Sequence, residues 1–490
     1  MCSTKTCISA VVLLFATLLV PFSASAQNTR YKLIDLDTFG GPDSAFPGPS
    51  PVAADVNDRG VAAGQAALPI PDPFCMFDCF LAHAFKWQNG MKTDLGTLPG
   101  GNFSAAGWIT ANGLVIGGST NGLMDPILGI PENHGVLWTE DNQIVDLGTL
   151  GGGLSFPNDV NNRNQIVGFS TTTTPDPFSF NGVQVRAFLW ENGVMSDLGT
   201  LGGPDASAFF INNHGQIAGF SYTSSTPNLS TGIPTLHIAL WENGTIKDLG
   251  SLGGLGSIAT TFNANEGFTV EINGMNERGD IVGTSPLTGD QMHHAFLWNG
   301  SLMDLGTLGG NNSRGWWVSN SGLVVGNADF SPQSTNHHAF RWKNGVMTDL
   351  GTLGPCLNST AFAVNSKGQA VGDTGDCPGG GGGPSFYSEN GEPMVDINTL
   401  VLPSSDIEVV DAIYISDKGE IAGAAMLPNG DFHAVLLVPA SAEEIAAANA
   451  LGAPRSAVAT VHTPIRNSES SVSGGRNRSM NIFRQRQRIP

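Results

Sequence analysis

The chain has 490 residues and a formal net charge of −20 at pH 7, and it contains 64 glycines but only 13% charged residues. This composition suits short strands joined by many tight turns and argues against coiled coils. The negative charge argues against nucleic acid as a partner, because phosphate binding needs a basic surface.

The first 26 residues are predicted to be an export signal that does not belong to the fold. Lys5 precedes an apolar run over residues 8–20, and Ala24-Ser25-Ala26 is the small-residue pattern of a cleavage site. The run is shorter than the roughly 20 residues that a membrane-spanning helix needs. We therefore expect a secreted or periplasmic protein whose mature chain has no integral membrane segment.

A repeated pattern fills the chain from residue 31 to residue 438. In its clearest copy an apolar strand ends at Trp190, an Asn-Gly turn follows, a second strand ends in Asp-Leu-Gly, and two further strands complete the unit. A fixed period of this size is typical of propellers, solenoids and other arrays. The aspartate of the Asp-Leu-Gly step recurs as Asp35, Asp94, Asp146, Asp197, Asp248, Asp304, Asp349 and Asp396. The glycine that closes the last strand recurs as Gly64, Gly117, Gly168, Gly219, Gly283, Gly326, Gly372 and Gly423.

The order of the strands predicts how the array closes. Asn-Gly between the first two strands tolerates the positive φ angles of a type I′ hairpin turn. The chain begins with the second strand of a unit, Leu33 to Asp37, and its last repeat element is a first strand, His433 to Leu437. These two fragments complete one sheet and leave no open edge. We therefore predict an all-β fold over residues 27–438, an eight-bladed β-propeller with four-stranded blades. A seven-bladed propeller and an open array are the alternatives.

Aromatic residues occupy one fixed position, at the end of the first strand of each unit. A large ring in every small sheet is what packing between neighbouring blades requires, so we interpret these residues as core. A sugar-binding platform is the alternative interpretation. The tryptophans at this position are Trp87, Trp138, Trp190, Trp241, Trp298 and Trp342, and Tyr387 and Leu437 take the place in the last two units.

Histidine recurs four residues before this aromatic position, and Arg186 interrupts the series. A catalytic pair is needed once, whereas these histidines and the repeat aspartates occur in nearly every unit, so we interpret them as structural hydrogen-bonding groups. A ring of calcium or another metal near the channel is the alternative. We expect no catalytic residue and no cofactor among them. The histidines are His83, His134, His237, His294, His338 and His433.

The segment His294-Ala295-Phe296-Leu297-Trp298, followed by Asp-Leu-Gly-Thr-Leu-Gly-Gly from Asp304, resembles the bacterial extracellular HAF repeat. The copies at 338–340 and 83–85 carry the same His-Ala-Phe signature, and the resemblance extends over residues 31–438. It implies a secreted bacterial protein with a repeat fold. It implies no activity, because the family has no assigned catalytic residues.

Four cysteines follow the predicted signal: Cys75, Cys79, Cys356 and Cys377. An even number outside the cytoplasm indicates disulfides. Each pair lies within one region between strands, so we predict the bridges Cys75–Cys79 and Cys356–Cys377. A metal site is the alternative, but the cysteines lack the spacing of a zinc finger.

Long insertions between strands all fall on one face of the predicted ring, opposite the tight turns. Variable, partly apolar loops on a rigid ring are where binding sites are usually built. We therefore expect this face to form the interaction surface, although each loop taken singly is also compatible with a solvated connector. The candidate binding residues are Phe74, Met76, Phe77, Phe80, Phe178, Phe180 and Tyr222.

These observations leave three hypotheses for function. The first is a non-catalytic secreted scaffold, expected to be a monomer, that binds an extracellular polymer or protein. The second is a hydrolase or lyase acting on extracellular polysaccharide, which needs acids outside the repeat to converge near the channel. The third is a structural component of the cell envelope. The acids considered for the second hypothesis are Asp72, Asp78, Asp176, Asp290 and Glu271.

The segment 439–490 differs in composition from the repeats. A capping box of Ser441 and Glu444 predicts a short helix over residues 442–450. The remainder is rich in Ser, Asn and Arg and has little to bury, so we expect it to be disordered. Its basic end offers an alternative role in attachment to acidic envelope polymers.

Overall fold

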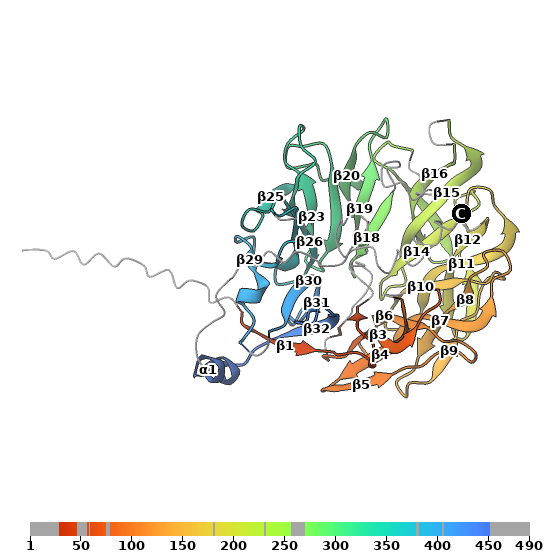
Figure 1. The fold of residues 1–490 in the computed structure, drawn as a ribbon. Helices are drawn as coiled ribbons and strands as arrows, with labels where there is room; N and C mark the ends of the chain where they lie inside the picture. The colour runs from red at the N-terminus through yellow and green to blue at the C-terminus, as the bar shows by residue number, and fades with distance from the viewer. Residues whose placement is uncertain are drawn as a thin grey trace, which may run out of the picture.

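The computed structural model describes residues 29–46, 56–57, 59–74, 79–179, 182–229, 232–255, 270–378, 382–403 and 406–450. Their strands form eight four-stranded antiparallel sheets. The sheets are arranged as blades around a central axis, with the first strand of each blade near the centre (Figure 1). The predicted eight-bladed propeller is confirmed, and the seven-bladed and open alternatives are wrong.

Each blade runs from an inner strand to an outer strand. Blades 1 to 4 consist of β2 (Ser44–Ala45), β3 (Ala62–Pro71), β4 (Phe80–Gln88) and β5 (Met91–Asp94); β6 (Ser104–Ile109), β7 (Val115–Met124), β8 (Pro131–Trp138) and β9 (Ile144–Asp146); β10 (Ser155–Val160), β11 (Ile166–Pro175), β12 (Val183–Glu191) and β13 (Val194–Asp197); and β14 (Ala206–Ile211), β15 (Ile217–Pro227), β16 (Pro234–Glu242) and β17 (Thr245–Gly250).

The other four blades follow the same order around the ring. They consist of β18 (Glu271–Met275), β19 (Ile281–Pro286), β20 (His293–Trp298) and β21 (Leu302–Asp304); β22 (Ser313–Val318), β23 (Val324–Asp329), β24 (His337–Lys343) and β25 (Val346–Gly351); β26 (Asn358–Val364), β27 (Gln369–Gly375), β28 (Ser385–Glu389) and β29 (Val395–Asp396); and β30 (Glu408–Ile415), β31 (Ile421–Met426), β32 (Phe432–Pro439) and β1 (Tyr31–Asp35). A 3-10 helix, η1 (Ile397–Thr399), follows β29.

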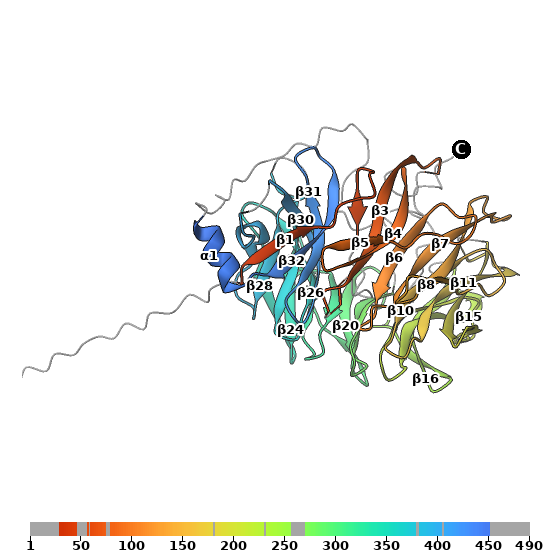
Figure 2. The ribbon, with the colours of Figure 1, turned by 90° about the horizontal axis from the view of Figure 1, so that it is seen from below.

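The eighth blade contains strands from both ends of the described chain. β1 pairs antiparallel with β32, from Tyr31 opposite Pro439 to Asp35 opposite Val435, and the two lie side by side in Figure 2. The sequence prediction that the two fragments share one sheet is therefore correct. Helix α1 (Ala442–Ala450) follows, and its capping box forms as predicted, because Glu444 N donates to Ser441 Oγ at 3.2 Å.

The boundaries of the blades differ from the units read in the sequence. The sequence pattern groups the strand ending at Trp190 with the strands that follow it, whereas the sheet that contains Trp190 is β10 to β13. The Asp-Leu-Gly-Thr-Leu-Gly-Gly segment is thus the connection between blades. The order of strands in the sequence is the same whichever strand is taken as the first of a unit. Only the pairing of the strands therefore identifies where one blade ends and the next begins.

The repeat glycine of the second strand faces a β-bulge in the inner strand. At Gly117, an added Cβ atom lies 2.0 Å from the carbonyl oxygen of Ala105, next to the shift in register between Ala106 and Trp108. No real Cβ atom makes such an approach, so glycine is required here by the backbone of the same blade. Equivalent approaches, within 2.0 Å, occur at Gly168, Gly219, Gly283, Gly326, Gly372 and Gly423.

The Asn-Gly turns join the third and fourth strands. In four hairpins, including Asn192-Gly193, both residues have positive φ and the flanking residues pair directly, as in a type I′ turn. Asn299 does not have positive φ, and its hairpin is one residue shorter. This turn therefore differs from the type I′ geometry predicted from its sequence.

The repeat tryptophans lie between blades. Trp138 is fully buried among residues of blades 1 and 2, and its Nε1 donates to the carbonyl oxygen of Leu95 in the preceding blade at 2.9 Å. Trp190, Trp241, Trp342 and Tyr387 are also buried, whereas Trp87 and Trp298 are partly exposed. The position of these aromatic residues is therefore that of side chains that pack between neighbouring blades.

Candidate ligand-binding face

Two kinds of segment share one face of the ring, which we call the insertion face. One kind joins the second and third strands of a blade, such as residues 125–130 between β7 and β8. The other joins successive blades, such as residues 198–205 between β13 and β14. The tight turns lie on the opposite face, which we call the turn face. This division follows from the alternating direction of the strands.

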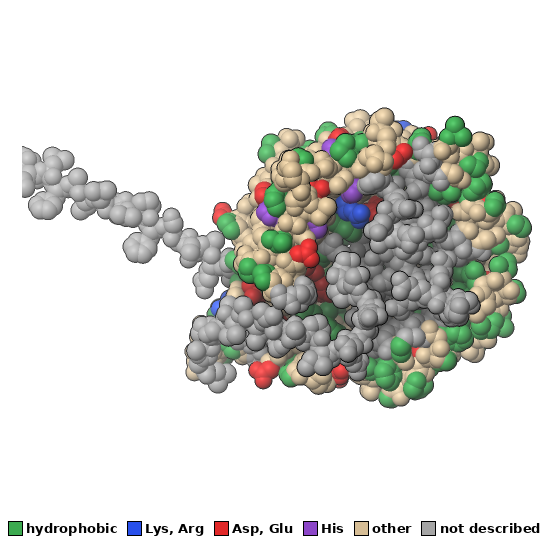
Figure 3. Space-filling model, turned by 45° about the horizontal axis from the view of Figure 1, so that its top comes forward, with side chains coloured by type: hydrophobic (Ala, Val, Ile, Leu, Met, Phe, Trp, Pro, Cys, Tyr) green, Lys and Arg blue, Asp and Glu red, His purple; other side chains and the backbone are tan. Residues whose placement is uncertain are grey.

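Exposed apolar side chains are concentrated on the insertion face. Among the described residues, nine of the thirteen exposed large hydrophobic side chains lie there: Ile70, Phe74, Leu123, Met124, Ile127, Leu229, Met292, Phe330 and Leu357. Three of the other four, Met91, Val194 and Val346, follow turns on the turn face. Figure 3 shows hydrophobic side chains spread around the rim of the molecule.

The predicted binding residues do not all reach this surface. Phe74 is 39% exposed, and Phe80 and Phe178 are partly exposed. Tyr222 is 0% exposed and packs with Leu236 and Ile238, so its ring belongs to the core and is not available to a ligand. Met76, Phe77 and Phe180 lie outside the described residues.

The sequence interpretation missed the loop of blade 2, where Leu123 and Ile127 are each 61% exposed. In the structure this loop is as long as that of blade 4, since six residues separate β7 from β8 and six separate β15 from β16. The available signal was its composition, since five large apolar residues, Leu123, Met124, Ile127, Leu128 and Ile130, fall within eight positions.

Aspartates fix the shape of the insertion loops. Asp72 Oδ1 accepts the N–H of Phe74 at 2.8 Å, and Asp176 Oδ1 accepts that of Phe178 at 2.9 Å. Asp125 accepts from two successive backbone N–H groups in the loop of blade 2. A carboxylate that bonds its own backbone two residues ahead stabilises a turn, so these loops are held in defined conformations.

The repeat histidines and aspartates meet as pairs across the third and fourth strands. In each pair the histidine Nδ1 lies 2.8–3.1 Å from the carboxylate. The pairs are His83–Asp94, His134–Asp146, His237–Asp248, His294–Asp304, His338–Asp349 and His433–Asp35. In blade 3, Arg186 replaces histidine and its Nε donates to Asp197 at 3.0 Å.

Each aspartate of these pairs also stabilises the start of the connection to the next blade. Asp94 Oδ1, for example, accepts the backbone N–H of Gly96 at 2.8 Å. Burial acts to raise the pKa of Asp94, but the hydrogen bonds from His83 and Gly96 outweigh it and hold the pKa below its ordinary value. The same balance lowers the pKa of Asp35, Asp146 and Asp304.

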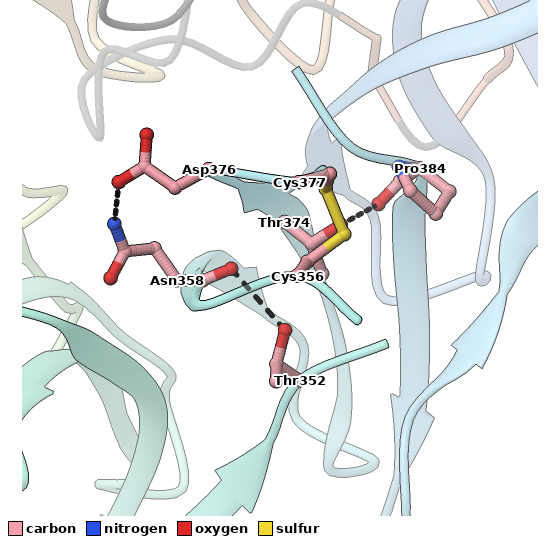
Figure 4. The surroundings of a disulfide bond; sticks show 7 residues. All are labelled: Thr352, Cys356, Asn358, Thr374, Asp376, Cys377 and Pro384. Atoms are coloured by element: carbon pink, nitrogen blue, oxygen red, sulfur yellow. Dashed lines mark hydrogen bonds between the residues drawn. A yellow bond between two sulfur atoms is a disulfide. The ribbon is translucent and has the colours of Figure 1, made fainter. Parts of the chain in front are cut away.

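Blade 7 replaces this pair with a disulfide, Cys356–Cys377, which is present as predicted. Gly383 occupies the repeat histidine position, and an added Cβ there lies 2.5 Å from Cys377 Sγ and 3.0 Å from Cys356 Sγ. The bridge thus lies where a side chain at position 383 would project. Figure 4 shows the bridge beside Thr374. Its repeat aspartate, Asp396, instead accepts the N–H of Asn398 and caps η1. The predicted Cys75–Cys79 bridge involves Cys75, outside the described residues.

A polar pocket of about 310 Å³ lies over blade 6 and reaches its neighbours in blades 5 and 7. It is lined by Arg314 and Trp316 of the inner strand β22 and by Asn327 and Asp329 of β23. His293, Asn312, Ser313, Thr335, His337 and Thr360 complete the lining. In Figure 3, histidine, basic and acidic side chains lie close together in the upper left part of the face.

The pocket is organised by hydrogen bonds between its own lining residues. Asn312 donates its backbone N–H and its Nδ2 to Asp329 Oδ2, at 3.1 and 3.0 Å, and its Oδ1 accepts the N–H of His293. Burial raises the pKa of Asp329 despite these bonds. Burial, together with the nearby Arg314 guanidinium, lowers the pKa of His293 to about 4, so its imidazole is neutral at pH 7.

A second group of ionisable residues lies at the junction of blades 3 and 4. Asp205 and Asp176 are both buried, and Asp205 Oδ1 accepts the N–H of Val185 at 2.8 Å. Burial, followed by the neighbouring Asp176 carboxyl, raises the pKa of Asp205 to about 8. One of the two carboxyl groups therefore keeps its proton at neutral pH.

The described acids among those considered for catalysis lie in three blades. Asp72 belongs to blade 1, Asp176 to blade 3, and Glu271 and Asp290 to blade 5, while Asp78 lies outside the described residues. Asp290 Oδ1 accepts the N–H of Leu255 at 2.8 Å, and Glu271 pairs with Arg314 at 3.5 Å. In the described part of the chain, no three His, Cys, Asp or Glu side chains are placed to hold a metal ion.

Comparisons with known proteins show only a distant likeness of shape. No family model matches the chain, and no curated protein is similar enough to match. The β-propeller domain of the Trilobed protease from Pyrococcus furiosus is 8% identical, with a TM-score of 0.38 over 75% of this chain and 95% of that one. Trypanosoma rangeli sialidase in complex with the inhibitor DANA is 9% identical, with a TM-score of 0.30 over 72% and 56%. The GH74 enzyme of Niastella koreensis is 10% identical, with a TM-score of 0.24 over 71% and 64%.

Within residues 29–450, gaps excepted, no helix has both the length and the apolar character to span a bilayer.

Proposed function

We propose that this protein is an exported, non-catalytic propeller of the HAF-repeat type that binds an extracellular polymer or protein through its insertion face. The observation that carries the proposal is the distribution of exposed apolar side chains, nine of thirteen on that face among the described residues. Apolar side chains that lie together at the surface usually mark a binding site, and on this face the loop of blade 2 holds three of them, Leu123, Met124 and Ile127.

The framework beneath this face supports the proposal. The loops are fixed by their own aspartates, and the His–Asp pairs stabilise the connections between them. A surface that is already ordered loses little conformational entropy on binding. Export agrees with the Cys356–Cys377 bridge, since disulfides persist in oxidising compartments.

A purely catalytic role has less support from the described residues. The acids considered for catalysis are distributed over blades 1, 3 and 5. Two non-repeat acids that do meet, Asp176 and Asp205, are both buried. Glycoside hydrolysis needs two carboxyl groups within about 10 Å of a single bond. The binding hypothesis requires no such convergence.

The test compares matched surface variants in a retention assay. The chain without its predicted signal is passed over immobilised glycans, peptidoglycan and envelope polysaccharides. The double variant Leu123→Ser/Ile127→Ser on the insertion face is expected to bind about tenfold more weakly, because two apolar contacts are lost. Val194→Ser/Val346→Ser is the control, because its side chains are equally exposed (60% and 63%) but lie by the turn face. Equal losses in both variants would contradict the proposal.

A further inference from the structure

The pocket over blade 6 has the construction of a small-molecule site. Its volume of about 310 Å³ lies at the lower end of the roughly 300–1,000 Å³ usual for ligand pockets. It opens on the insertion face, but its lining is mostly polar, in contrast to the apolar side chains around the rim. The pocket and the rim therefore suit different parts of a ligand.

One wall of the pocket is aromatic. The Trp316 ring packs edge to face against Phe362, with 6.1 Å between ring centroids. Its Nε1 donates to Asn327 Oδ1 at 2.8 Å, which fixes the orientation of the indole. The indole of Trp316 is thus an apolar group with a defined position at the pocket.

Two polar side chains of the pocket, Arg314 and Asn327, have hydrogen-bonding capacity that the described part of the chain does not use. The Arg314 guanidinium has five N–H donors, yet within the described residues it makes one long hydrogen bond, 3.5 Å to Glu271. The Nδ2 group of Asn327 makes no hydrogen bond to another described residue. Donors of these two kinds, fixed beside an aromatic ring, match a ligand with several hydroxyl groups and an apolar face.

The charges in the pocket argue against an anionic ligand. Arg314 is paired with Glu271, and the carboxyl of Asp329 forms part of the wall. At neutral pH the formal positive charge of the pocket therefore does not exceed its negative charge, and the chain as a whole carries −20. A ligand carboxylate or sulfate would meet no net attraction here.

We infer that this pocket binds one neutral sugar residue of an extracellular glycan, with the pyranose ring against Trp316 and its hydroxyl groups on Arg314 and Asn327. The inference rests on the proposed binding function and specifies its ligand class. Apolar side chains around the rim would then contact the rest of the polymer or its carrier.

The inference is tested with free monosaccharides and the 19F signals of the protein labelled with fluorotryptophan. The chain has nine tryptophans, and the variants Trp316→Phe and Trp317→Phe assign two neighbouring signals. Trp317 packs against Tyr414 and does not line the pocket. Glucose, galactose, mannose or N-acetylglucosamine is expected to shift the Trp316 signal saturably in the millimolar range and to leave the Trp317 signal unchanged.

Two arginine variants complete the experiment. Arg314→Gln is expected to lower the affinity for the sugar that binds best by about tenfold. Arg341→Gln is the matched control, because Arg341 lies in the same blade and bonds the carbonyl oxygen of Asn390 away from the pocket. The inference is overturned if no sugar shifts the Trp316 signal, if Arg314→Gln has no effect, or if galacturonate binds more tightly than galactose.

The outcome separates this inference from the proposed function. Retention on a polymer that depends on Leu123 and Ile127, without any sugar-dependent shift at Trp316, removes the inference and leaves the binding function in place. A specific shift at Trp316 without retention on any polymer or protein supports the sugar site and removes the proposed binding function.

Discussion

His433 Nδ1 lies 2.8 Å from Asp35 Oδ1, although 398 residues separate the two in the chain. This contact repeats, across the junction of the first and last strands, the pair that other blades form between neighbouring strands. It therefore belongs to the closure of the ring, and the local repeat chemistry contributes directly to the global topology.

The closure pair predicts a particular pH dependence of stability. Asp35→Asn is expected to lower the free energy of unfolding by about 1 kcal/mol. Burial acts to lower the pKa of His433 and to raise that of Asp35, but their mutual hydrogen bond outweighs it, so the pKa of His433 is raised and that of Asp35 is lowered. The histidine contribution is lost as pH rises above the ordinary value of 6.5, and the aspartate contribution is lost as pH falls below 3.8.

Thermal unfolding of the wild-type protein and of Asp35→Asn, measured from below pH 3.8 to above pH 8, tests this pH dependence. The difference between wild type and Asp35→Asn is expected to be largest between pH 3.8 and pH 6.5. Asp349→Asn is the control for an internal pair, which does not join the chain ends. A difference that keeps growing above pH 8 would contradict the assignment.

Asp205→Asn is expected to stabilise the protein at neutral and alkaline pH. Because the pKa of Asp205 is raised to about 8, the folded state binds more protons than the unfolded state between pH 4 and pH 8, and stability falls as pH rises through that range. Asparagine removes this loss and retains an oxygen for the N–H of Val185. Asn312 and Asn358 already play the equivalent role in blades 6 and 7.

Denaturant unfolding at several pH values checks this prediction. The gain should be near zero at pH 4, grow as pH rises, and level off above pH 8. Asp43→Asn is the matched control, since Asp43 accepts the corresponding N–H, that of Phe432, in blade 8. Loss of stability at every pH in Asp205→Asn would show that the carboxylate itself is needed.

Gly117→Ala is expected to destabilise the propeller by about 3 kcal/mol or to prevent folding, because the new methyl group lies 2.0 Å from a carbonyl oxygen. Gly107→Ala in the same blade is the control, since its nearest contact is an ordinary 3.7 Å. Melting temperatures of the two soluble variants, or their yields of folded protein, distinguish the sites. Equal tolerance would contradict the bulge geometry.

Removal of the Cys356–Cys377 bridge by a double change to serine is expected to cost about 3 kcal/mol, because the closed loop spans 21 residues. The variant should also lose most of the response of its melting temperature to a reductant. An unchanged response would indicate that this bridge does not control stability.

The sequence predicts the repeat chemistry better than it predicts the surface. Blade number and closure follow from the phase of the strands, since Leu33 and His433 can share a sheet only in a closed ring. The first and last strand of each blade do not follow from the sequence, because the Trp190 strand has the same pattern whether it is grouped with the strands before it or with those after it. Tyr222 resembles a loop aromatic in sequence, yet the long strand β15 carries it into the core.

No sequence pattern predicts which residues line the pocket over blade 6. Arg314 and Trp316 lie on β22, whereas Asn327 and Asp329 lie on β23, and no spacing rule links them to Thr360 of the next blade. The unused donors of Arg314 become visible only when its partners are known. A tryptophan outside the repeat position, such as Trp316, was the one signal that sequence reasoning could have followed.

Hydrogen–deuterium exchange with and without the polymer that the protein retains tests the central claim most directly. We predict that binding slows exchange in the insertion-face segments, above all residues 121–130 and 327–337, and leaves the Asn-Gly turns of the opposite face unchanged. Protection confined to those turns, with the insertion-face segments unaffected, would contradict the account.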